Sequence, residues 1–287
     1  TYETLYESVL QDRLDRPQNW KELCDVTYSD ARIISTSYDS DTGGFPTVST
    51  VTRGTAFSLS DMVQTAESLT ISTGRDLPVF VDWGDLAQSP WTRPMEIFAR
   101  IGARLNEFIE VDFLDDHASW TNIGTSSIGA GGTSTTTITV SAANVDDIIR
   151  AVRRETRAAN GQVFMAEKGL GFAWAPANFE FLEAFAQANG FESADDSLKR
   201  GLAPQVQYLG AYHYITNDNV ANHMFAGVRK VHRIGILRGT YGKSHTIEFP
   251  AGSTNNNLSG VAYYSRVDIG TLAPGGFTTI LYDVNVA

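Results

Sequence analysis

One long apolar stripe constrains this chain more than any other feature of its sequence. In the stretch WTRPMEIFARIGARLNEFIEVDFLDD, apolar residues recur every three or four positions, which is the spacing of one face of an α-helix: Met95, Phe98, Gly102, Leu105 and Ile109. A helix over about 92–115 has a length of roughly 35 Å at about 1.5 Å per residue. Helices in globular domains typically have about 10–14 residues. The sequence therefore predicts one helix that is long for a globular domain.

Length and composition narrow the class of protein. The chain has 287 residues, and 42% of them are hydrophobic. This length corresponds to one large domain or two interlocked domains, with enough apolar residues for a sizeable core. Cys24 is the only cysteine, which excludes a disulfide framework within the chain. No apolar run approaches the roughly 18 residues of a membrane span, and the N-terminus carries acids where a signal peptide has bases. We expect a soluble protein made in a cytoplasm, with no membrane partner.

The first third of the chain predicts an arm followed by a long extension. Residues 1–31 begin with a helical segment, TYETLYESVLQDRL, that Pro17 stops, and they offer little core beyond an isolated anchor, Trp20. β-branched and Ser/Thr-rich runs on both sides of DSDTGG predict a hairpin over 32–53. Short apolar runs broken by glycine and proline continue the strand signals. We therefore predict a strand-rich extension over 32–85 with few residues able to fill a core.

The remainder predicts a mixture of helices and strands. The stretch VSAANVDDIIRAVRRETRAANG has acids in its first turn, arginines further along and Asn160-Gly161 as a stop, all typical of a helix. In FAWAPANFEFLEAF a short apolar run leads directly into a helical pattern, with Pro176 at the first helical position. Such a joint is either an active-site elbow or a packing contact in a structural protein. The final third is nearly all β, so the fold class is α+β.

Motifs that carry chemistry are weak or missing. No HExxH, GxSxG or P-loop pattern occurs. The run beginning at Asp39 lacks two ligands of a calcium loop, and a hairpin turn explains it better. His117 follows Asp115 and Asp116, which offers either a ligand trio or the charged end of a helix, where a cationic histidine is favourable; we favour the second interpretation. The sequence nominates no catalytic residue, no metal site and no cofactor, and we expect a protein that is not an enzyme.

Charge is distributed unevenly along the chain. The net charge of −11 argues against avid binding of nucleic acid, which needs clustered lysine and arginine. The stretch 229–243 nevertheless has five bases and no acid, whereas 32–85 has seven acids and three bases. This is either an ordinary mixed surface, or the acidic extension of one subunit lies on the basic strands of another. The second interpretation gives candidate contacts between subunits: Asp39, Asp41, Asp61, Glu67, Arg229, Lys230, Arg233, Arg238 and Lys243.

The order of these elements resembles that of the major capsid proteins of tailed bacteriophages, which have the Hong Kong 97-type fold. The shared order is an arm, a long β-hairpin extension, a long helix, a capped helix, a strand-Pro-helix joint, a Tyr-rich strand and returning strands. The resemblance covers essentially the whole chain. It implies an N-terminal arm at 1–31, an extended loop at 32–85, a peripheral domain at 86–139 and 236–287 with its spine helix at about 92–115, and an axial domain at 140–235. It also implies that the joint at Pro176 is a packing contact.

The resemblance further implies a function. Copies of the chain would assemble as pentamers and hexamers into an icosahedral head shell that encloses double-stranded DNA without sequence-specific binding. The protein would be made in the bacterial host cytoplasm and end in the virion. Scaffold, portal and cement proteins are the further candidate partners. Some family members are cross-linked through a lysine of the extended loop, but the five lysines here, at 21, 168, 199, 230 and 243, lie outside 32–85. We therefore predict no such cross-links.

Three other functions compete with this interpretation. An encapsulin-like nanocompartment shell has the same fold and holds a cargo enzyme, and a cargo-peptide site on the inner wall would distinguish it. A β-rich carbohydrate-active enzyme agrees with the content of tyrosine and tryptophan, but the five tryptophans are scattered and no clear carboxylate pair occurs. A tail-tube protein or another virion β-protein is disfavoured by the two well-marked helices in the middle of the chain.

Overall fold

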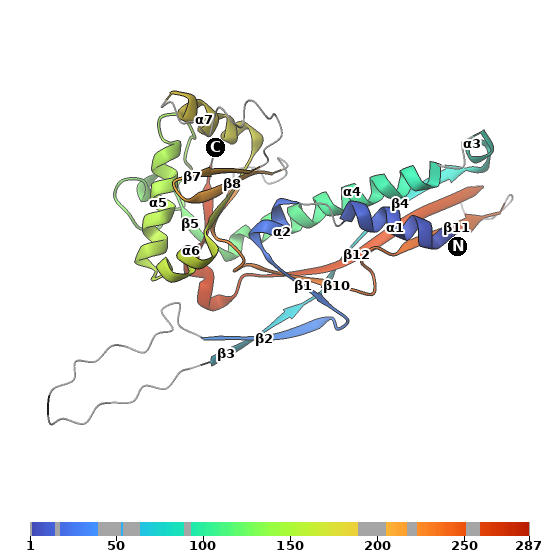
Figure 1. Ribbon diagram of the computed structural model, residues 1–287, viewed down its shortest axis with the longest axis horizontal. Coiled ribbons are helices and arrows are strands. Elements are labelled where there is room, and N and C mark those ends of the chain that lie inside the picture. The colour runs from blue at the N-terminus through green and yellow to red at the C-terminus, as the bar shows by residue number, and fades with distance from the viewer. Residues whose placement is uncertain are drawn as a thin grey trace.

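The computed structural model describes residues 2–14, 18–39, 53, 64–88, 93–188, 205–216, 223–250 and 259–286. Figure 1 shows an elongated molecule with two regions, each built on a sheet, and a hairpin that projects away from both. Helix α4 and strand β12 run along the length of one region. Among the described residues, no helix combines the length and the apolar character needed to cross a bilayer.

The long helix dominates the first region. Helix α4 spans Arg93–Leu114, within a residue or so of the expected 92–115. Its stripe is buried, with Phe98, Leu105 and Ile109 at 1% exposure or less. The helix packs on a sheet of order β1-β10-β12-β11, in which β4 also pairs with β12. The bounds of these strands are β1 Asp25–Ser29, β4 Thr73–Asp82, β10 Arg233–Leu237, β11 Ser244–Phe249 and β12 Gly260–Leu272.

The second region contains a six-stranded sheet with helices around it. Its order is β5-β13-β9-β6-β8-β7, with β5 Thr121–Ile123, β6 Leu170–Trp174, β7 Gln205–Tyr208, β8 Ala211–Ile215, β9 His223–Val228 and β13 Leu281–Asn285. The helices of this region are α5 Val145–Ala158, α6 Gln162–Lys168 and α7 Pro176–Ala188. Three short 3-10 turns complete it: η1 Asp115–Ser119, η2 Thr125–Ser127 and η3 Gly275–Ile280.

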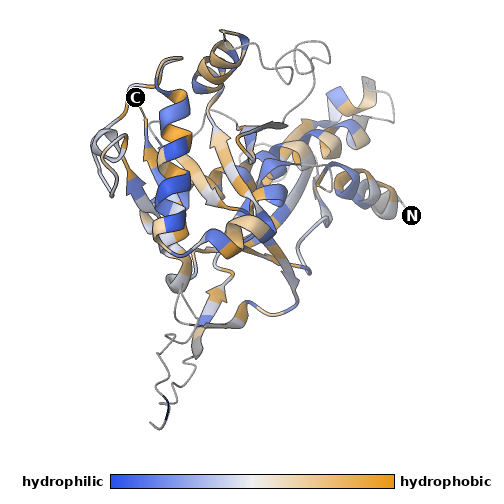
Figure 2. Cartoon of the chain, turned by 60° about the vertical axis from the view of Figure 1, so that its left-hand side comes forward, coloured by the Kyte–Doolittle hydropathy of each residue, from blue (hydrophilic) through white to orange (hydrophobic). Residues whose placement is uncertain are grey.

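The joint at Pro176 is a packing contact inside this second region. All five residues of β6 are buried, as expected for a central strand covered on both faces. Helix α7 begins at Pro176 and buries Phe179 and Leu182. Figure 2, in which the left-hand side of Figure 1 comes forward, shows hydrophilic residues along the outer faces of helices there and apolar residues on the strands within. The joint thus helps to close the core. No residue of β6 or α7 lines either of the two clefts described below.

The projecting hairpin differs in its pairing from the sequence prediction. Strand β2, Ile33–Asp39, pairs with β3, Gln64–Thr70, over seven residues. The sequence predicted a partner within 45–53, so the predicted pairing of β2 is wrong. Most of 45–53 lies outside the described residues. The end of β2 at Asp39 and the start of β3 at Gln64 are far apart in sequence. Only the antiparallel pairing of the two strands identifies them as one hairpin.

Four strands join sheets other than those that the sequence predicted. Strand β4, expected within the extension, pairs with β12 over ten residues. Strand β1, expected in the arm, pairs in parallel with β10. Strands β5 and β13, expected in the peripheral domain, pair with each other, and β13 pairs with β9 in the second sheet. Each of these pairings joins segments that are distant in sequence, which local periodicity does not report.

Candidate assembly surfaces

The N-terminal arm is fixed against the long helix. Helix α1, Tyr2–Leu14, lies along α4, and Leu10 and Leu14 are fully buried there. The rings of Tyr6 and Phe98 stack with their centroids 5.2 Å apart. A Cβ at Gly102 would lie 2.9 Å from Cβ of Arg13, so that only glycine permits α1 to approach this closely. The helical arm is therefore part of the folded subunit rather than a free tail.

The basic stretch 229–243 meets this arm within the same chain. The guanidinium of Arg229 lies 2.7 Å from a carboxylate oxygen of Glu22 and 4.2 Å from the centre of the Tyr212 ring. The ammonium of Lys230 donates to the carbonyl of Lys21. The Arg229 side chain is 13% exposed and that of Glu22 is 51% exposed, so water reaches the pair from the carboxylate side and screens it as it does a surface ion pair.

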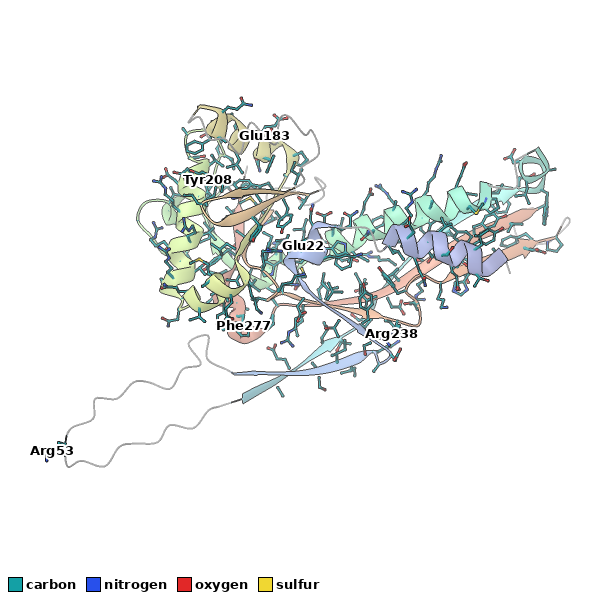
Figure 3. The ribbon with its side chains drawn as sticks, in the orientation of Figure 1. Glu22, Arg53, Glu183, Tyr208, Arg238 and Phe277 are labelled. Carbon is teal, nitrogen blue, oxygen red and sulfur yellow. The ribbon has the colours of Figure 1, made fainter. Side chains whose placement is uncertain are left out.

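The other three bases of the stretch also lie beside the arm. Lys243 is 3.5 Å from Glu7, and Arg238 is 3.9 Å from Asp30, where both side chains are largely exposed. Arg233 stands opposite Asp25 in the pairing of β1 with β10. Figure 3 shows Arg238 on the side of the molecule from which the hairpin projects. The acids beside these bases, at 7, 22, 25 and 30, lie in the predicted arm and have no local sequence feature that marks them as partners.

The predicted acidic partners are only partly described. The carboxylate of Glu67 accepts a 2.9 Å hydrogen bond from the backbone N–H of Gly275 in its own chain. Asp39 ends strand β2, but its side chain is outside the described part of the structure, as are Asp41 and Asp61. The contact between acidic and basic segments of neighbouring subunits therefore stays a prediction. Of Arg229, Arg238 and Lys243, which each lie beside an acid of the arm, Arg238 has the most exposed side chain.

An apolar patch lies at the far end of the first region. We call it the tip patch and define it as Phe80, Trp83, Ile247 and Phe249 from β4, α3 (Trp83–Gln88) and β11. Phe80, Trp83 and Ile247 are each at least 36% exposed. The Phe80 and Phe249 rings meet edge to face, and the indole of Trp83 donates 3.1 Å to the carbonyl of Phe249. Contiguous exposed aromatic residues are typical of protein–protein contacts.

A cleft adjoins the tip patch. It has a volume of about 540 Å³ and lies between β4 and α4, with Val79, Phe80, Val81, Asp85, Glu96, Ile97 and Arg100 along its walls. Its walls carry apolar side chains together with three charged ones. A second cleft, of about 430 Å³, has three lysines in its lining: Lys21, Lys168 and Lys230. Both clefts are formed mainly by elements of the first region or its junction with the second.

His117 lies in the 3-10 turn η1, directly after α4, which is the end of the long helix where the favoured sequence interpretation placed it. The trio of Asp115, Asp116 and His117 is divided, because Asp116 lies 2.8 Å from Nε2 of His232. Nδ1 of His117 instead lies 3.6 Å from Asp283, a residue that sequence analysis did not nominate. Nδ1 of His223 is 2.9 Å from the same carboxylate. These three residues, which we call the His-His-Asp cluster, are the one group of three or more metal-ligating side chains found among the described residues.

Other titratable groups with displaced pKa values are buried singly. Burial raises the pKa of Glu110 to about 7, against a hydrogen bond from Asn19 that lowers it. Burial lowers the pKa of His213 to about 4 and raises the pKa of the Cys24 thiol. None of these three residues lines either of the two clefts. Their positions indicate packing roles rather than a shared reaction centre.

Comparisons with known proteins give a result only at the level of structure. No family model matches the chain, and no curated protein matches its sequence. The capsid of cyanophage P-SCSP1u is similar over 94% of this chain and 88% of that one, with a TM-score of 0.59 and 11% identity. The mature capsid of bacteriophage PhiM1 is similar over 94% and 87%, with a TM-score of 0.57 and 13% identity.

A virus-like particle is also among the similar structures. The particle from Pyrococcus furiosus is similar over 99% of both chains, with a TM-score of 0.56 and 13% identity. Identities this low concern the fold alone. They agree with the α+β arrangement found here, with its projecting hairpin, long helix and two sheets. The chain has the Hong Kong 97-type fold of the major capsid proteins of tailed bacteriophages.

Proposed function

We propose that this chain is a major capsid protein whose copies assemble into a closed icosahedral head around double-stranded DNA. The observation that carries the proposal is the similarity to phage capsids over nine-tenths of the chain. The hairpin supports it. Leu69, at its base, is buried and lies against Gly235, whereas Ile33 is 61% exposed. An extended element that buries little in its own chain gains stability by covering a neighbour.

We propose that each of the two large sheets belongs to one domain of the subunit. The arm with α4 and the first sheet forms the peripheral domain, and the second sheet with α5, α6 and α7 forms the axial domain. The extended loop then ends at Thr70, not at residue 85, because β4 belongs to the first sheet. Strands β5 and β13 go with the axial domain because β13 pairs with β9 and β5 pairs with β13. Pentamers and hexamers would form through these domains, with the tip patch as one contact surface.

The acidic balance supports a container for DNA rather than a DNA-binding protein. The net charge is −11, and the five bases of 229–243 lie beside groups of the arm in the same chain. These bases would therefore offer the phosphates of DNA few unpaired cations. Weak binding of this kind suits a shell in which the DNA must be able to slide. On this proposal the protein is made in the host cytoplasm, resides in the virion, has no catalytic role and meets scaffold, portal and cement proteins there.

A nanocompartment shell is the second candidate function. The observation that favours it is the similarity to the Pyrococcus furiosus particle over 99% of both chains. Both candidates require a closed shell of many copies, and they differ in what the shell contains. A phage head holds DNA, whereas a nanocompartment holds protein cargo.

Electron microscopy of the purified protein tests the shell, and analysis of the contents separates the two candidates. We expect closed particles or rings of five and six subunits, with nuclease-protected DNA in particles recovered from infected cells. Protein cargo without DNA would favour the nanocompartment. A stable monomer or dimer at high concentration would refute both. Boiling the particles in detergent should release a band at the chain mass of 31.3 kDa, whereas a ladder of covalent oligomers would contradict the predicted lack of cross-links.

A hairpin variant tests the role of the extended loop. Replacing 41–62 with a short Gly/Ser linker leaves the seven-residue pairing of β2 with β3 in place. We expect this variant to keep the circular dichroism spectrum of the wild-type subunit and to lose closed particles. Particles of unchanged size and yield would show that the loop makes no essential contact with neighbours.

A further inference from the structure

The His-His-Asp cluster lies where three separate elements meet. His117 lies in the 3-10 turn η1, which directly follows α4. His223 is the first residue of β9 and Asp283 lies on β13. In the antiparallel pairing of these strands Asn285 stands opposite His223, and Asp283 opposite Phe225. His223 and Asp283 are therefore diagonal neighbours on one face of the second sheet. The turn after α4 brings His117 to that same face.

The spacing of the three side chains fits a metal ion. A tetrahedral zinc ion with bonds of about 2.0–2.1 Å holds its ligand atoms about 3.3 Å apart. Nδ1 of His223 is 2.9 Å and Nδ1 of His117 is 3.6 Å from the same oxygen of Asp283. One ligand atom from each residue can be chosen so that all three lie within 4.8 Å of one another. The observed distances fall on both sides of the expected value.

Burial at the cluster is unequal, which suits a metal site with an open position. The side chain of Asp283 is 3% exposed, whereas those of His117 and His223 are 28% and 29% exposed. The carboxylate is thus held from inside the fold, and the two imidazoles form the rim. An ion can enter from solvent and keep a water as its fourth ligand.

The buried carboxylate of Asp283 favours a bound cation. Burial raises the pKa of Asp283, and the two histidines act against this shift. Among the described residues, the ion pairs of Asp283 come from these two histidines and from no lysine or arginine. Burying a carboxylate to 3% exposure is costly unless a positive charge compensates it.

We propose that His117, His223 and Asp283 bind one divalent transition-metal cation, with zinc as the preferred ion. Two imidazole nitrogens and one carboxylate oxygen are a ligand set that suits zinc, cobalt and nickel, and it lacks the thiolate or thioether that copper(I) prefers. The ion supplies the positive charge that the buried carboxylate needs. It also ties the end of α4 to two strands of the second sheet, so that it fastens the two regions of the subunit together.

Binding requires one defined rearrangement. The rings of His117 and His223 stack with centroids 3.6 Å apart and planes 15° apart. A metal lies in the plane of each imidazole that bonds it, so the two rings must fan open by rotation about χ2. Both side chains are more than a quarter exposed, so the rotation moves the rings into solvent. We expect the metal-free and metal-bound forms to differ mainly in the imidazole orientations.

The experiment uses the purified full-length protein, stripped with EDTA and then dialysed against buffer with or without zinc. At pH 7.5 we expect bound zinc at one ion per chain and a rise of several degrees in the thermal midpoint, because a ligand of the native state stabilises it. Cobalt in place of zinc should give the visible absorption of a tetrahedral site. His117→Ala and Asp283→Asn should lose the bound ion, the midpoint rise and the cobalt absorption together.

His245→Ala is the matched control, since it also removes one histidine. His245 is exposed on β11 and stacks on Tyr264, away from the cluster. This variant should bind zinc as the wild type does. Equal zinc binding by the wild type and His117→Ala would overturn the proposal. A thermal midpoint of the wild type that changes with pH but not with added zinc would also overturn the proposal. It would show that protonation, rather than a metal ion, stabilises the cluster. Circular dichroism without metal establishes that each variant is folded.

Discussion

The indole nitrogen of Trp20 donates a 2.8 Å hydrogen bond to the side-chain oxygen of Asn106, in the middle of α4. Both residues are fully buried. The amide nitrogen of Asn106 lies within 3.3 and 3.4 Å of the carbonyls of Arg13 and Leu14, at the end of α1. One asparagine thus satisfies the end of α1 and the anchor in α2, Asn19–Leu23. The arm is fixed to the long helix by polar contacts in an otherwise apolar core.

Removing the hydrogen bond while keeping an aromatic ring tests this anchor. We expect Trp20→Phe to lower the free energy of unfolding by about 1–3 kcal/mol, because the buried oxygen of Asn106 loses its donor. Trp20→Ala should cost about 3–5 kcal/mol, since it also leaves a cavity. Chemical denaturation of unassembled subunits measures both. An equal loss for the two variants would show that the hydrogen bond contributes and the packing does not.

A glycine in the apolar stripe tests how closely α1 approaches α4. A Cβ at Gly102 would lie 2.9 Å from the Arg13 side chain and 3.1 Å from the Leu10 carbonyl. We expect Gly102→Ala to destabilise the subunit by about 1–3 kcal/mol through overpacking. Gly239→Ala is the control, because a Cβ there meets nothing within 4 Å. Arm release is read separately, from faster proteolysis within residues 2–14. A Gly102 variant as stable as the control would refute the close approach.

Two buried groups predict opposite dependences on pH. The pKa of Glu110 is raised to about 7 by burial, so the native state binds a proton that the unfolded state has released, and stability falls from about pH 4.5 to about pH 7. The pKa of His213 is lowered to about 4 by burial, so its contribution to stability is lost as pH falls from about 6.5 to about 4. Each shift corresponds to about 3 kcal/mol. The two effects oppose each other over most of this range.

Variants separate the two contributions. We expect Glu110→Gln to gain about 3 kcal/mol relative to the wild type between pH 4.5 and pH 8, since the amide has no charge to bury. His213→Asn should gain relative to the wild type as pH falls from 6.5 to 4, while its amide oxygen still accepts from the indole of Trp174, which donates to Nδ1 of His213. Urea denaturation at a series of pH values measures these differences. Parallel curves for all three proteins would contradict the assignment.

The tip patch predicts a defect in assembly that spares the subunit. We expect Phe80→Ser with Trp83→Ser to reduce the yield of closed particles, because exposed apolar side chains gain stability only when a neighbour covers them. The thermal midpoint of the unassembled subunit should change little. Phe108→Ser is the control, since Phe108 is similarly exposed on α4 and lies away from the patch. Particle yield by light scattering that is equal for all proteins would exclude the tip patch as an interface.

Local patterns in the sequence were sufficient for several elements. The spacing of Phe98, Leu105 and Ile109 identified α4, because one helix buries one face whatever lies against it. Pro176 marked the start of α7 because proline fits the first helical position. Trp20 was recognised as an anchor from its isolation in a polar arm. The arm, however, was expected to have little core of its own, and its burial against α4 became visible only with Asn106 and Gly102.

Pairs between segments that are distant in the chain could not be predicted from the sequence. The hairpin was predicted within 32–53, but β2 has its partner at 64–70, since many β-rich segments fit the same alternating pattern. The run of bases at 229–243 is visible in the sequence, but Glu22 and Glu7, which pair with two of them, lie more than two hundred residues away. Nothing in the local sequence distinguishes those partners from other acids.

The sequence by itself determined the period of the helices, the positions where they start and stop, and the order of elements that resembles a phage capsid protein. The tertiary structure alone decided which strands pair, which charges meet, and that His117, His223 and Asp283 share one place. The physical reason is that helix geometry is set by neighbours three and four residues apart. Sheets and side-chain clusters are set by contacts between distant segments, whose choice depends on the packing of the whole chain.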